Sequence, residues 1–311
     1  MSNFVIEQIE LIMIIVMTGG TSGIGFEALK HFAKSPNTKV YVGARGSGRI
    51  VPKGTDVLPL DLSSLRNVRS FADNIKQRLG PTKIDVLVLN AAIRATDKKQ
   101  RNEEGFELTF ATNHLSHYLL ARLFLSNMGK DSKIVITTSD THDPAIVPFG
   151  PKTLNPEELA YPNEDSPKGM RLYAATKLCN LITARSLSAI NVNDNRGIGV
   201  IAFNPGLTGG TSLMGKQSAF MKVMITFLIR PILYVVSMYK PFLFVGKAEH
   251  AGKTLAALAL GKVTLPKDKI YASLVRGKVK FPNPSQLAQN NAIRDLLWKE
   301  SAKMVDLSEQ V

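Results

Sequence analysis

The sequence predicts one α/β domain over residues 1–311, a doubly wound parallel sheet flanked by helices. Two observations predict this fold class. Strand-like and helix-like segments alternate along the chain, as they do where crossover helices join parallel strands. The glycine-rich and polar motifs also follow directly after predicted strands, at the edge where open parallel sheets bind ligands. An apolar content of 44% suffices for one large core.

The predicted strands are short apolar segments. The first, 11–17, is uninterrupted and runs into a glycine-rich turn, which favours a buried parallel strand. In chain order the strands are expected at 11–17, 39–44, 57–60, 84–89, 133–138, 199–203 and 270–274.

The predicted helices carry apolar residues at helical spacing. The second begins at a serine cap, Ser63 or Ser64, and stops at Gly80-Pro81. In chain order the helices are expected at about 22–34, 65–79 and 104–128, in a segment that carries residues 173 and 177 and ends near 190, at 249–260, and from about 285.

Two segments interrupt this alternation. The connection 46–60 is short and rich in glycine and proline, so a loop or a single turn is expected there instead of a crossover helix. The apolar segment 220–245 is broken by lysine, arginine and proline. It is either a substrate lid or interfacial amphipathic segment, within a loop region at about 207–248, or a pair of ordinary buried helices.

Composition limits the partners. The formal net charge of +14 favours an anionic partner, which can be nucleic acid, anionic lipid or a phosphate-rich cofactor. No nucleic-acid partner is expected, because the basic residues are spread along the chain without an aromatic-interleaved basic block. Most of these charges are expected on a solvated surface. Five scattered histidines and one cysteine offer no metal-binding spacing, so no metal is expected.

The expected location is cytoplasmic, with peripheral membrane contact left open. The single cysteine, Cys179, cannot form an internal disulfide, which fits a reducing compartment. The apolar run 11–17 has no basic region before it and no small-residue cleavage site after it, so no signal peptide is predicted. That run is also too short to span a bilayer.

The turn after the first strand is suited to a dinucleotide. Glycines permit a tight turn and let the backbone approach a pyrophosphate at a helix N-terminus, where amide groups and the helix dipole favour anions. A purely structural turn is the alternative. In this Rossmann-type arrangement, the residues expected to bind the cofactor are Thr18, Gly19, Thr21, Ser22, Gly23, Ile24 and Gly25.

Arg45 follows the second predicted strand, where such folds distinguish two nicotinamide cofactors. An acidic residue there binds the 2′-hydroxyl of NAD, whereas an arginine suits the 2′-phosphate of NADP. Arg49 and Lys53 are close in sequence, and no acidic residue precedes Asp56. NADP(H) is therefore favoured as the cofactor, while NAD(H) is not excluded; a solvent-exposed arginine without this role is the alternative.

A second group of residues is suited to proton transfer. Tyr173 and Lys177 are four residues apart and share one helix face. An ammonium beside a phenol favours the phenolate, so Lys177 is expected to lower the pKa of Tyr173 and can reach the nicotinamide ribose. Ser139 adds a hydroxyl that can polarise a carbonyl. Asn113 is unfavourable inside a helix, which suggests a local role such as holding a water; a surface asparagine is the alternative.

Together these motifs resemble the short-chain dehydrogenase/reductase superfamily over about residues 11–275. The resemblance is carried by the turn 18–25, Asp61-Leu62-Ser63-Ser64, Asn90-Ala91-Ala92, Asn113, Ser139, Tyr173, Lys177 and Asn204-Pro205-Gly206. It implies that Tyr173 is the general acid/base, Lys177 its pKa modifier and ribose ligand, and Ser139 the substrate-polarising hydroxyl. Asn113 would hold a proton-relay water, and Asp61 would contact adenine. The further cofactor contacts that it implies are Leu62, Asn90, Ala91, Pro205, Gly206 and Thr208.

Within the superfamily the chain is similar to the retinol dehydrogenase, WW-domain oxidoreductase and protochlorophyllide reductase group, whose members act on bulky lipophilic substrates. The similarity lies in residues 104–108, 112–117, 139–142 and 177–180. Leu207 stands where protochlorophyllide reductases usually carry a cysteine, which counts against their photochemistry.

The sequence thus predicts an enzyme that uses NADP(H) to transfer hydride to or from a lipophilic carbonyl or alcohol, retinal-like or similar. Two alternatives stay open. One is reduction of a C=C bond in a tetrapyrrole-like or polyene substrate, and the other is a non-catalytic NADP-binding scaffold, which the intact catalytic group argues against. The substrate, the direction of reaction and a homo-oligomeric state are left undetermined.

Overall fold

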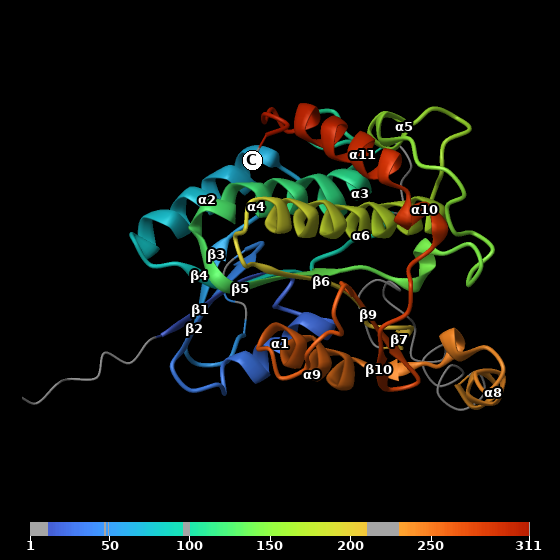
Figure 1. Cartoon of the computed structure of the whole chain (residues 1–311), viewed down its shortest axis with the longest axis horizontal. Helices are drawn as coiled ribbons and strands as arrows, with labels where there is room; N and C mark the ends of the chain where they lie inside the picture. The colour runs from blue at the N-terminus through green and yellow to red at the C-terminus, as the bar shows by residue number, and fades with distance from the viewer. Residues whose placement is uncertain (1–11, 47, 49, 96–99, 210–229, 311) are drawn as a thin grey trace, which may run out of the picture.

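The computed structural model describes residues 12–46, 48, 50–95, 100–209 and 230–310 and has the predicted doubly wound α/β fold (Figure 1). Its eight-stranded sheet has the order β10-β9-β6-β5-β4-β1-β2-β3, and every neighbouring pair is parallel except β9 with β10. The strands are β1 Met13–Thr18, β2 Thr38–Ala44, β3 Thr55–Pro59, β4 Ile84–Leu89, β5 Met128–Thr137, β6 Gly199–Asn204, β9 Tyr271–Val275 and β10 Lys278–Lys280.

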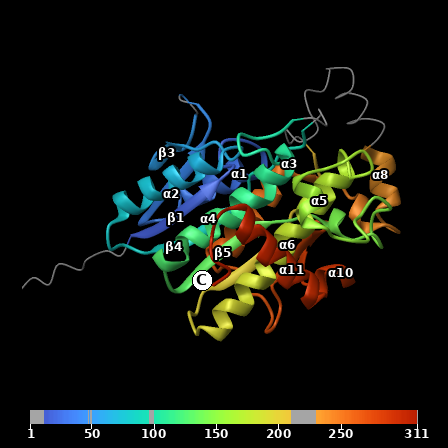
Figure 2. The same cartoon turned by 90° about the horizontal axis from the view of Figure 1, so that it is seen from above.

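Helices cover both faces of this sheet (Figures 1 and 2). One face is covered by α2 (Leu65–Leu79), α4 (Ser116–Phe124) and α6 (Met170–Asn193), with α11 (Asn291–Met304) packed against the outer side of α6, and the other face is covered by α1 (Gly23–Phe32) and α9 (Ala248–Ala259). In β1, Val16 belongs to the core under the first layer, whereas Ile15 and Met17 belong to the core under the second. Because both faces are covered, the strand is apolar from Met13 to Met17, as its sequence indicated.

The strand order determines where a ligand can bind. β1 pairs with β2 on one side and with β4 on the other, so the direction of winding reverses between β1 and β4. The carboxyl ends of strands at such a switch point border the ligand crevice of open α/β sheets.

The long helix expected at about 104–128 is divided and shorter. Glu107 begins it, because its carboxylate accepts a hydrogen bond from the Phe110 N–H. The segment then passes through α3 (Leu108–Phe110), a π-helical turn (Ala111–Leu115), α4 and a 3₁₀ turn (Leu125–Asn127). β5 begins at Met128, five residues earlier than the sequence indicated.

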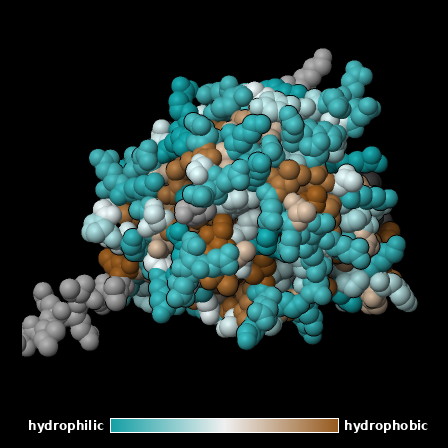
Figure 3. Space-filling view, turned by 45° about the horizontal axis from the view of Figure 1, so that its top comes forward, coloured by the Kyte–Doolittle hydropathy of each residue, from teal (hydrophilic) through white to brown (hydrophobic). Residues whose placement is uncertain are grey.

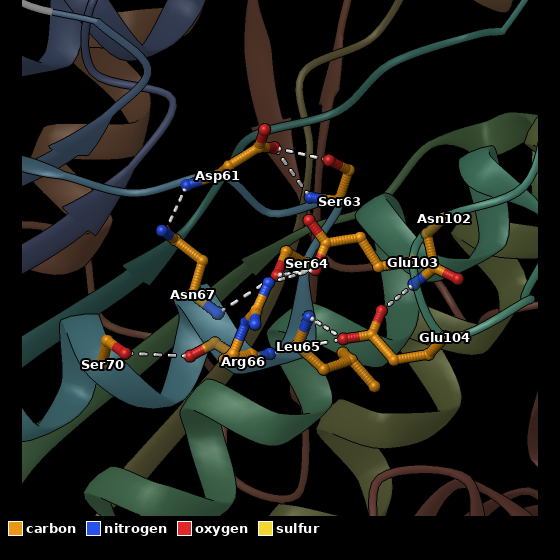
Figure 4. A network of polar contacts seen from close by, with 10 residues as sticks. All are labelled: Asp61, Ser63, Ser64, Leu65, Arg66, Asn67, Ser70, Asn102, Glu103 and Glu104. Atoms are coloured by element: carbon orange, nitrogen blue, oxygen red, sulfur yellow. Dashed lines mark hydrogen bonds and ion pairs between the residues drawn. The ribbon is translucent and has the colours of Figure 1, made fainter.

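Glu104, expected inside that helix, instead caps another one. Its Oε1 accepts hydrogen bonds from the backbone N–H groups of Leu65 and Arg66 at the N-terminus of α2 (Figure 4). A carboxylate is favourable there because it satisfies free amide donors and meets the positive end of the helix dipole. Ser64 adds the expected cap by accepting from the Asn67 N–H. This network fixes the first turn of α2 next to Asp61.

The connection after Arg45 contains no helix among its described residues, as expected, and β3 follows from Thr55. The predicted C-terminal helix is divided at Asn290, whose Oδ1 caps α11, so that a short α10 (Gln286–Gln289) precedes it. Several elements were not predicted, among them the edge strand β10 and the short helix α5 (Pro156–Ala160).

The region at about 207–248 is described in part, and residues 210–229 lie outside the described ranges. The described parts are a small parallel pair, β7 (Thr208–Gly209) with β8 (Gly246–Lys247), the helix α8 (Arg230–Val236) and a 3₁₀ turn (Pro241–Leu243). Within the described residues, no helix is both long and apolar enough to cross a membrane. Figure 3 shows hydrophilic side chains over most of one face, with smaller apolar areas between them.

Candidate active site

A cavity of about 830 Å³ lies at the carboxyl ends of the parallel strands. It collects nearly all of the residues that the sequence singled out, although they come from seven separate parts of the chain. The predicted residues that line it are Gly19, Thr21, Ser22, Gly23, Ile24, Gly25, Arg45, Asp61, Leu62, Asn90, Ala91, Ser139, Tyr173, Lys177, Pro205, Gly206 and Thr208. Thr18 and Asn113 are buried outside this lining.

The glycine turn between β1 and α1 leaves no room for side chains. A Cβ atom on Gly25 would lie 2.0 Å from the Gly19 carbonyl oxygen and 2.5 Å from Asn90 Nδ2. Gly19 has a φ of +68°, and a Cβ there would lie 2.8 Å from the Ala91 backbone. The turn therefore requires glycine at both positions, and it exposes backbone to the cavity where α1 begins.

Thr18 ties together the ends of the two strands at the switch point. Its Oγ1 accepts hydrogen bonds from the backbone N–H groups of Asn90 (3.0 Å) and Ala91 (3.1 Å), which follow β4. With both acceptor positions used, its hydroxyl donates to His117 Nε2 at 2.9 Å. His117 then carries its proton on Nδ1, which donates to the Asn113 carbonyl oxygen at 3.1 Å. Burial lowers the pKa of His117 to about 3, with Lys177 adding to the effect, so this histidine is neutral.

Asn113 uses its side chain to hold the loop after β4. Its Oδ1 accepts from the Ile93 N–H at 2.8 Å, and its Nδ2 donates to the Ile93 carbonyl oxygen at 2.9 Å and to Thr176 Oγ1 at 3.2 Å. The residue lies in the π-helical turn, a distortion often found at functional sites. The structure thus gives Asn113 a positioning role beside the cavity, and the water that the family resemblance assigns to it stays a prediction.

Tyr173 and Lys177 face the cavity from one side of α6. Lys177 Nζ lies 5.6 Å from the centre of the Tyr173 ring and donates to the Thr137 carbonyl oxygen at 3.1 Å. Asn180 donates to the same oxygen, and Thr138 Oγ1 donates to the Lys177 carbonyl oxygen. These bonds join α6 to the end of β5 and fix the ammonium below the ring.

Lys177 was expected to lower the pKa of the Tyr173 phenol, but the groups of the protein raise it. Burial raises the pKa of Tyr173, the Asp140 carboxyl raises it further, and Arg94 lowers it. Burial also lowers the pKa of Lys177 to about 7, so its side-chain amine is only partly protonated near neutrality. The prediction of a lowered phenol pKa is therefore wrong for the chain by itself. A protonated Tyr173 is suited to donate a proton.

Ser139 lies at the cavity wall where β5 ends. Its Oγ accepts from the Thr141 N–H at 3.3 Å and donates to Asp140 Oδ1 at 3.4 Å. Its backbone is held by His142, which sequence reasoning did not single out. The Ser285 N–H donates to His142 Nε2 at 3.2 Å, so Nδ1 carries the proton and donates to the Ser139 carbonyl oxygen at 2.6 Å. The segment before α10 thus helps to orient the hydroxyl.

The opposite end of the cavity is formed by Arg45 and Asp61. Arg45 is exposed at the end of β2. Asp61 Oδ1 accepts from both the N–H and the hydroxyl of Ser63, and the Asp61 N–H donates to Asn67 (Figure 4). The carboxylate is thereby held at the cavity wall by the α2 cap network.

A dinucleotide fits these residues. The turn excludes side chains, α1 begins there without an acidic residue in its first turn, and both features favour a pyrophosphate. Thr112 and Thr141 also line the cavity, and their buried Oγ1 atoms have no hydrogen-bond partner among the described residues. Within the described part of the chain, no cluster of His, Cys, Asp or Glu side chains is suited to hold a metal ion.

Comparisons with known proteins agree with this geometry. The family model for short chain dehydrogenases matches residues 13–146. The chain is 29% identical over 326 residues to a protochlorophyllide reductase from Avena sativa, covering 95% of this chain and 100% of the relative. A structure of a putative uncharacterized protein from Mycobacterium paratuberculosis has a TM-score of 0.68 at 22% identity, covering 97% of this chain and 98% of the other. An alcohol dehydrogenase from Thermococcus sibiricus, solved with 5-hydroxy-NADP, has a TM-score of 0.57 at 19% identity, covering 88% and 99%.

Residues 13–146 thus match the short chain dehydrogenase model, and the chain as a whole resembles the short-chain dehydrogenase/reductase superfamily of oxidoreductases. Its similarity extends over most of its length to the protochlorophyllide reductase group, as the sequence motifs indicated.

Proposed function

We propose that this protein is an NADP(H)-dependent oxidoreductase that transfers hydride between the nicotinamide and a lipophilic carbonyl or alcohol. The observation that carries the proposal is the meeting of Ser139, Tyr173 and Lys177 with the glycine turn in one cavity. The related alcohol dehydrogenase structure with 5-hydroxy-NADP supports the choice of cofactor, as does Arg45 at the end of β2.

The protein's groups would act on the substrate oxygen. Bound NADPH would supply the hydride. Ser139 would donate a hydrogen bond to the carbonyl oxygen and so stabilise the negative charge that develops there. Tyr173, kept protonated by burial, would give its proton to that oxygen. Lys177, with its pKa lowered to about 7, would then return a proton toward the tyrosine.

A titration with NADPH and with NADH, followed by nicotinamide fluorescence, tests the cofactor. Tight NADPH binding with weak NADH binding is the expected result. Equal affinities would move the assignment to NAD(H) or to both cofactors. No binding of either would contradict the proposal and favour a protein that keeps the fold without the activity.

Replacement of Tyr173 by phenylalanine tests the chemistry. It removes the hydroxyl and keeps the ring over Lys177, so turnover of a lipophilic aldehyde should fall by roughly 10²- to 10⁴-fold while NADPH affinity stays nearly unchanged. Steady-state rates with a retinoid and steroid carbonyl panel give the first value, and fluorescence titration gives the second. A variant that retained most of its activity would show that another group supplies the proton.

Reduction of a C=C bond is the second candidate function. The observation that favours it is the 29% identity to a protochlorophyllide reductase over 95% of this chain. Leu207, which lines the cavity, stands where the resemblance leads one to expect a cysteine, and this difference counts against the photochemical reaction of those enzymes. Product analysis with an enone or polyene aldehyde separates the two reactions, because one gives an alcohol and the other a saturated carbonyl.

Peripheral membrane contact is a further part of this proposal. Residues 232–239 expose large apolar side chains next to Phe242 and Leu243, which line the cavity. A lipophilic substrate could then enter from an anionic membrane surface. Flotation with vesicles of anionic phospholipid should carry the protein upward, and a protein that stays wholly in solution would remove this part.

A further inference from the structure

Arg94 places a cation in the cavity wall close to the reacting group. It follows the motif after β4, lies half-buried and lines the same cavity as Tyr173. Its charge is near enough to lower the pKa of the Tyr173 phenol, against the effects of burial and Asp140. The guanidinium therefore lies within electrostatic range of the hydroxyl that is proposed to move the proton.

The partner that the structure gives Arg94 is a poor one. Its Nη1 donates to the Met170 thioether sulfur at 3.2 Å, and a thioether is a weak acceptor for a group with five N–H donors. Among the described residues, no carboxylate forms an ion pair with Arg94. Among the residues that the structure describes, no strong hydrogen-bond acceptor therefore contacts the N–H groups of Arg94.

The surroundings of Arg94 make an anion favourable. Apolar side chains line the same cavity as Arg94, among them Val147, Phe149, Met170, Leu207, Phe242 and Leu243, and Met170 contacts it directly. A cation beside apolar walls loses hydration, and this cost is offset best by an oppositely charged partner. Asp140 also lines the cavity, but hydrogen bonds from Ser139 and Asn204 engage its carboxyl, and burial raises its pKa toward the neutral form.

We propose that Arg94 binds a carboxylate carried by the lipophilic substrate and so orients the reacting group toward Tyr173. The inference rests on the proposed function, because it names the substrate class for the same site, an apolar molecule with one acidic group. A planar guanidinium can hold such a carboxylate through two parallel hydrogen bonds. Arg94 is thus a specificity-determining residue in the wall of the cavity.

Binding of cis-parinaric acid and of its methyl ester tests this inference. The two polyenes differ in one charge, and their fluorescence rises in an apolar site without any turnover. NADPH-loaded protein should bind the acid at least tenfold more tightly than the ester. Arg94→Gln should weaken binding of the acid by roughly 10- to 100-fold and leave the ester unchanged, while Arg94→Lys should retain part of the preference.

Arg171→Gln is the matched control, because Arg171 is an exposed cation beside Met170 that does not line the cavity. It should leave both affinities unchanged. Equal binding of acid and ester by the wild type, binding of neither, or equal losses for both in Arg94→Gln would overturn the inference. NADPH titration of each variant shows that the site is folded. A protein that binds the acid through Arg94 but reduces no carbonyl would contradict the proposed function alone.

Discussion

The two ends of the cavity are built in different ways. At the cofactor end, the backbone of the β1–α1 turn forms the wall, and a Cβ on Gly25 would lie 2.0 Å from a neighbouring carbonyl oxygen. At the end that is proposed to bind the substrate, the wall includes side chains such as Phe149, Phe242 and Arg94. The first end is therefore determined by sterics that allow almost no change, whereas the second can vary in shape and charge without disturbing the sheet.

Gly25→Ala is expected to have the largest effect because it acts on the wall that cannot adapt. The new methyl group would collide with the Gly19 carbonyl and with Asn90 Nδ2, so the turn must shift away from its pyrophosphate-binding form. NADPH affinity should fall by roughly 100-fold or more, a loss of about 3 kcal/mol or more. Fluorescence titration measures the change.

Gly129→Ala provides the control for that variant. A Cβ on Gly129 would meet the Lys83 side chain at 3.6 Å, which is an ordinary contact, so its NADPH affinity should equal that of the wild type. If Gly25→Ala bound NADPH as well as the control did, the cofactor end would be as adaptable as the substrate end, and the contrast between them would fail.

Lys177 lies at the boundary between the two ends and gives a prediction for stability. Burial lowers its pKa from 10.5 to about 7, so between these values the unfolded chain binds more protons than the folded one. The free energy of unfolding must then rise with pH in this window, by up to about 1.4 kcal/mol per pH unit. The burial penalty is fully present below pH 7 and is relieved as the pH increases.

Denaturant titrations of the wild type and of Lys177→Met at pH 7, 8 and 9 measure this effect. The difference in free energy of unfolding, wild type minus variant, should increase from pH 7 to pH 9. Taking the difference cancels the contributions of the other titrating groups. A constant difference would mean that Lys177 stays charged in the folded protein, and the proton-return step proposed for it would lose its support.

Features that depend on local sequence could be predicted, and those that depend on distant parts of the chain could not. The apolar strands, the glycine turn and the Tyr173–Lys177 pair follow from spacing within a few residues, and the structure places them as expected in the fold. Glu104 reads as part of a helix, yet it caps α2, because its partners lie 39 and 38 residues away.

The site shows the same limit. Thr18 belongs to the glycine motif, but its hydroxyl is used between β1, β4 and His117, which only the strand order brings together. His142 supports Ser139 through a residue of the C-terminal segment, Ser285. The sequence around Arg94 shows only a cation shortly after the end of a strand, which does not predict a role for it. Its relation to Tyr173 depends on how the loop after β4 and the start of α6 come together.

The smallest effect is expected from Arg45→Ala, which tests how far the cofactor end relies on one side chain. Loss of the guanidinium should weaken NADPH binding by about tenfold, or roughly 1.4 kcal/mol, and leave NADH binding unchanged, since NADH carries no 2′-phosphate. Lys53→Ala is the matched control, because Lys53 is an exposed cation on the same connection that does not line the cavity. Equal losses in the two variants would indicate a general charge effect. If only Arg45→Ala loses affinity, and only for NADPH, the preference for NADPH depends on a side chain even though backbone forms the wall at this end. The substrate preference is proposed to depend on a side chain in the same way, that of Arg94.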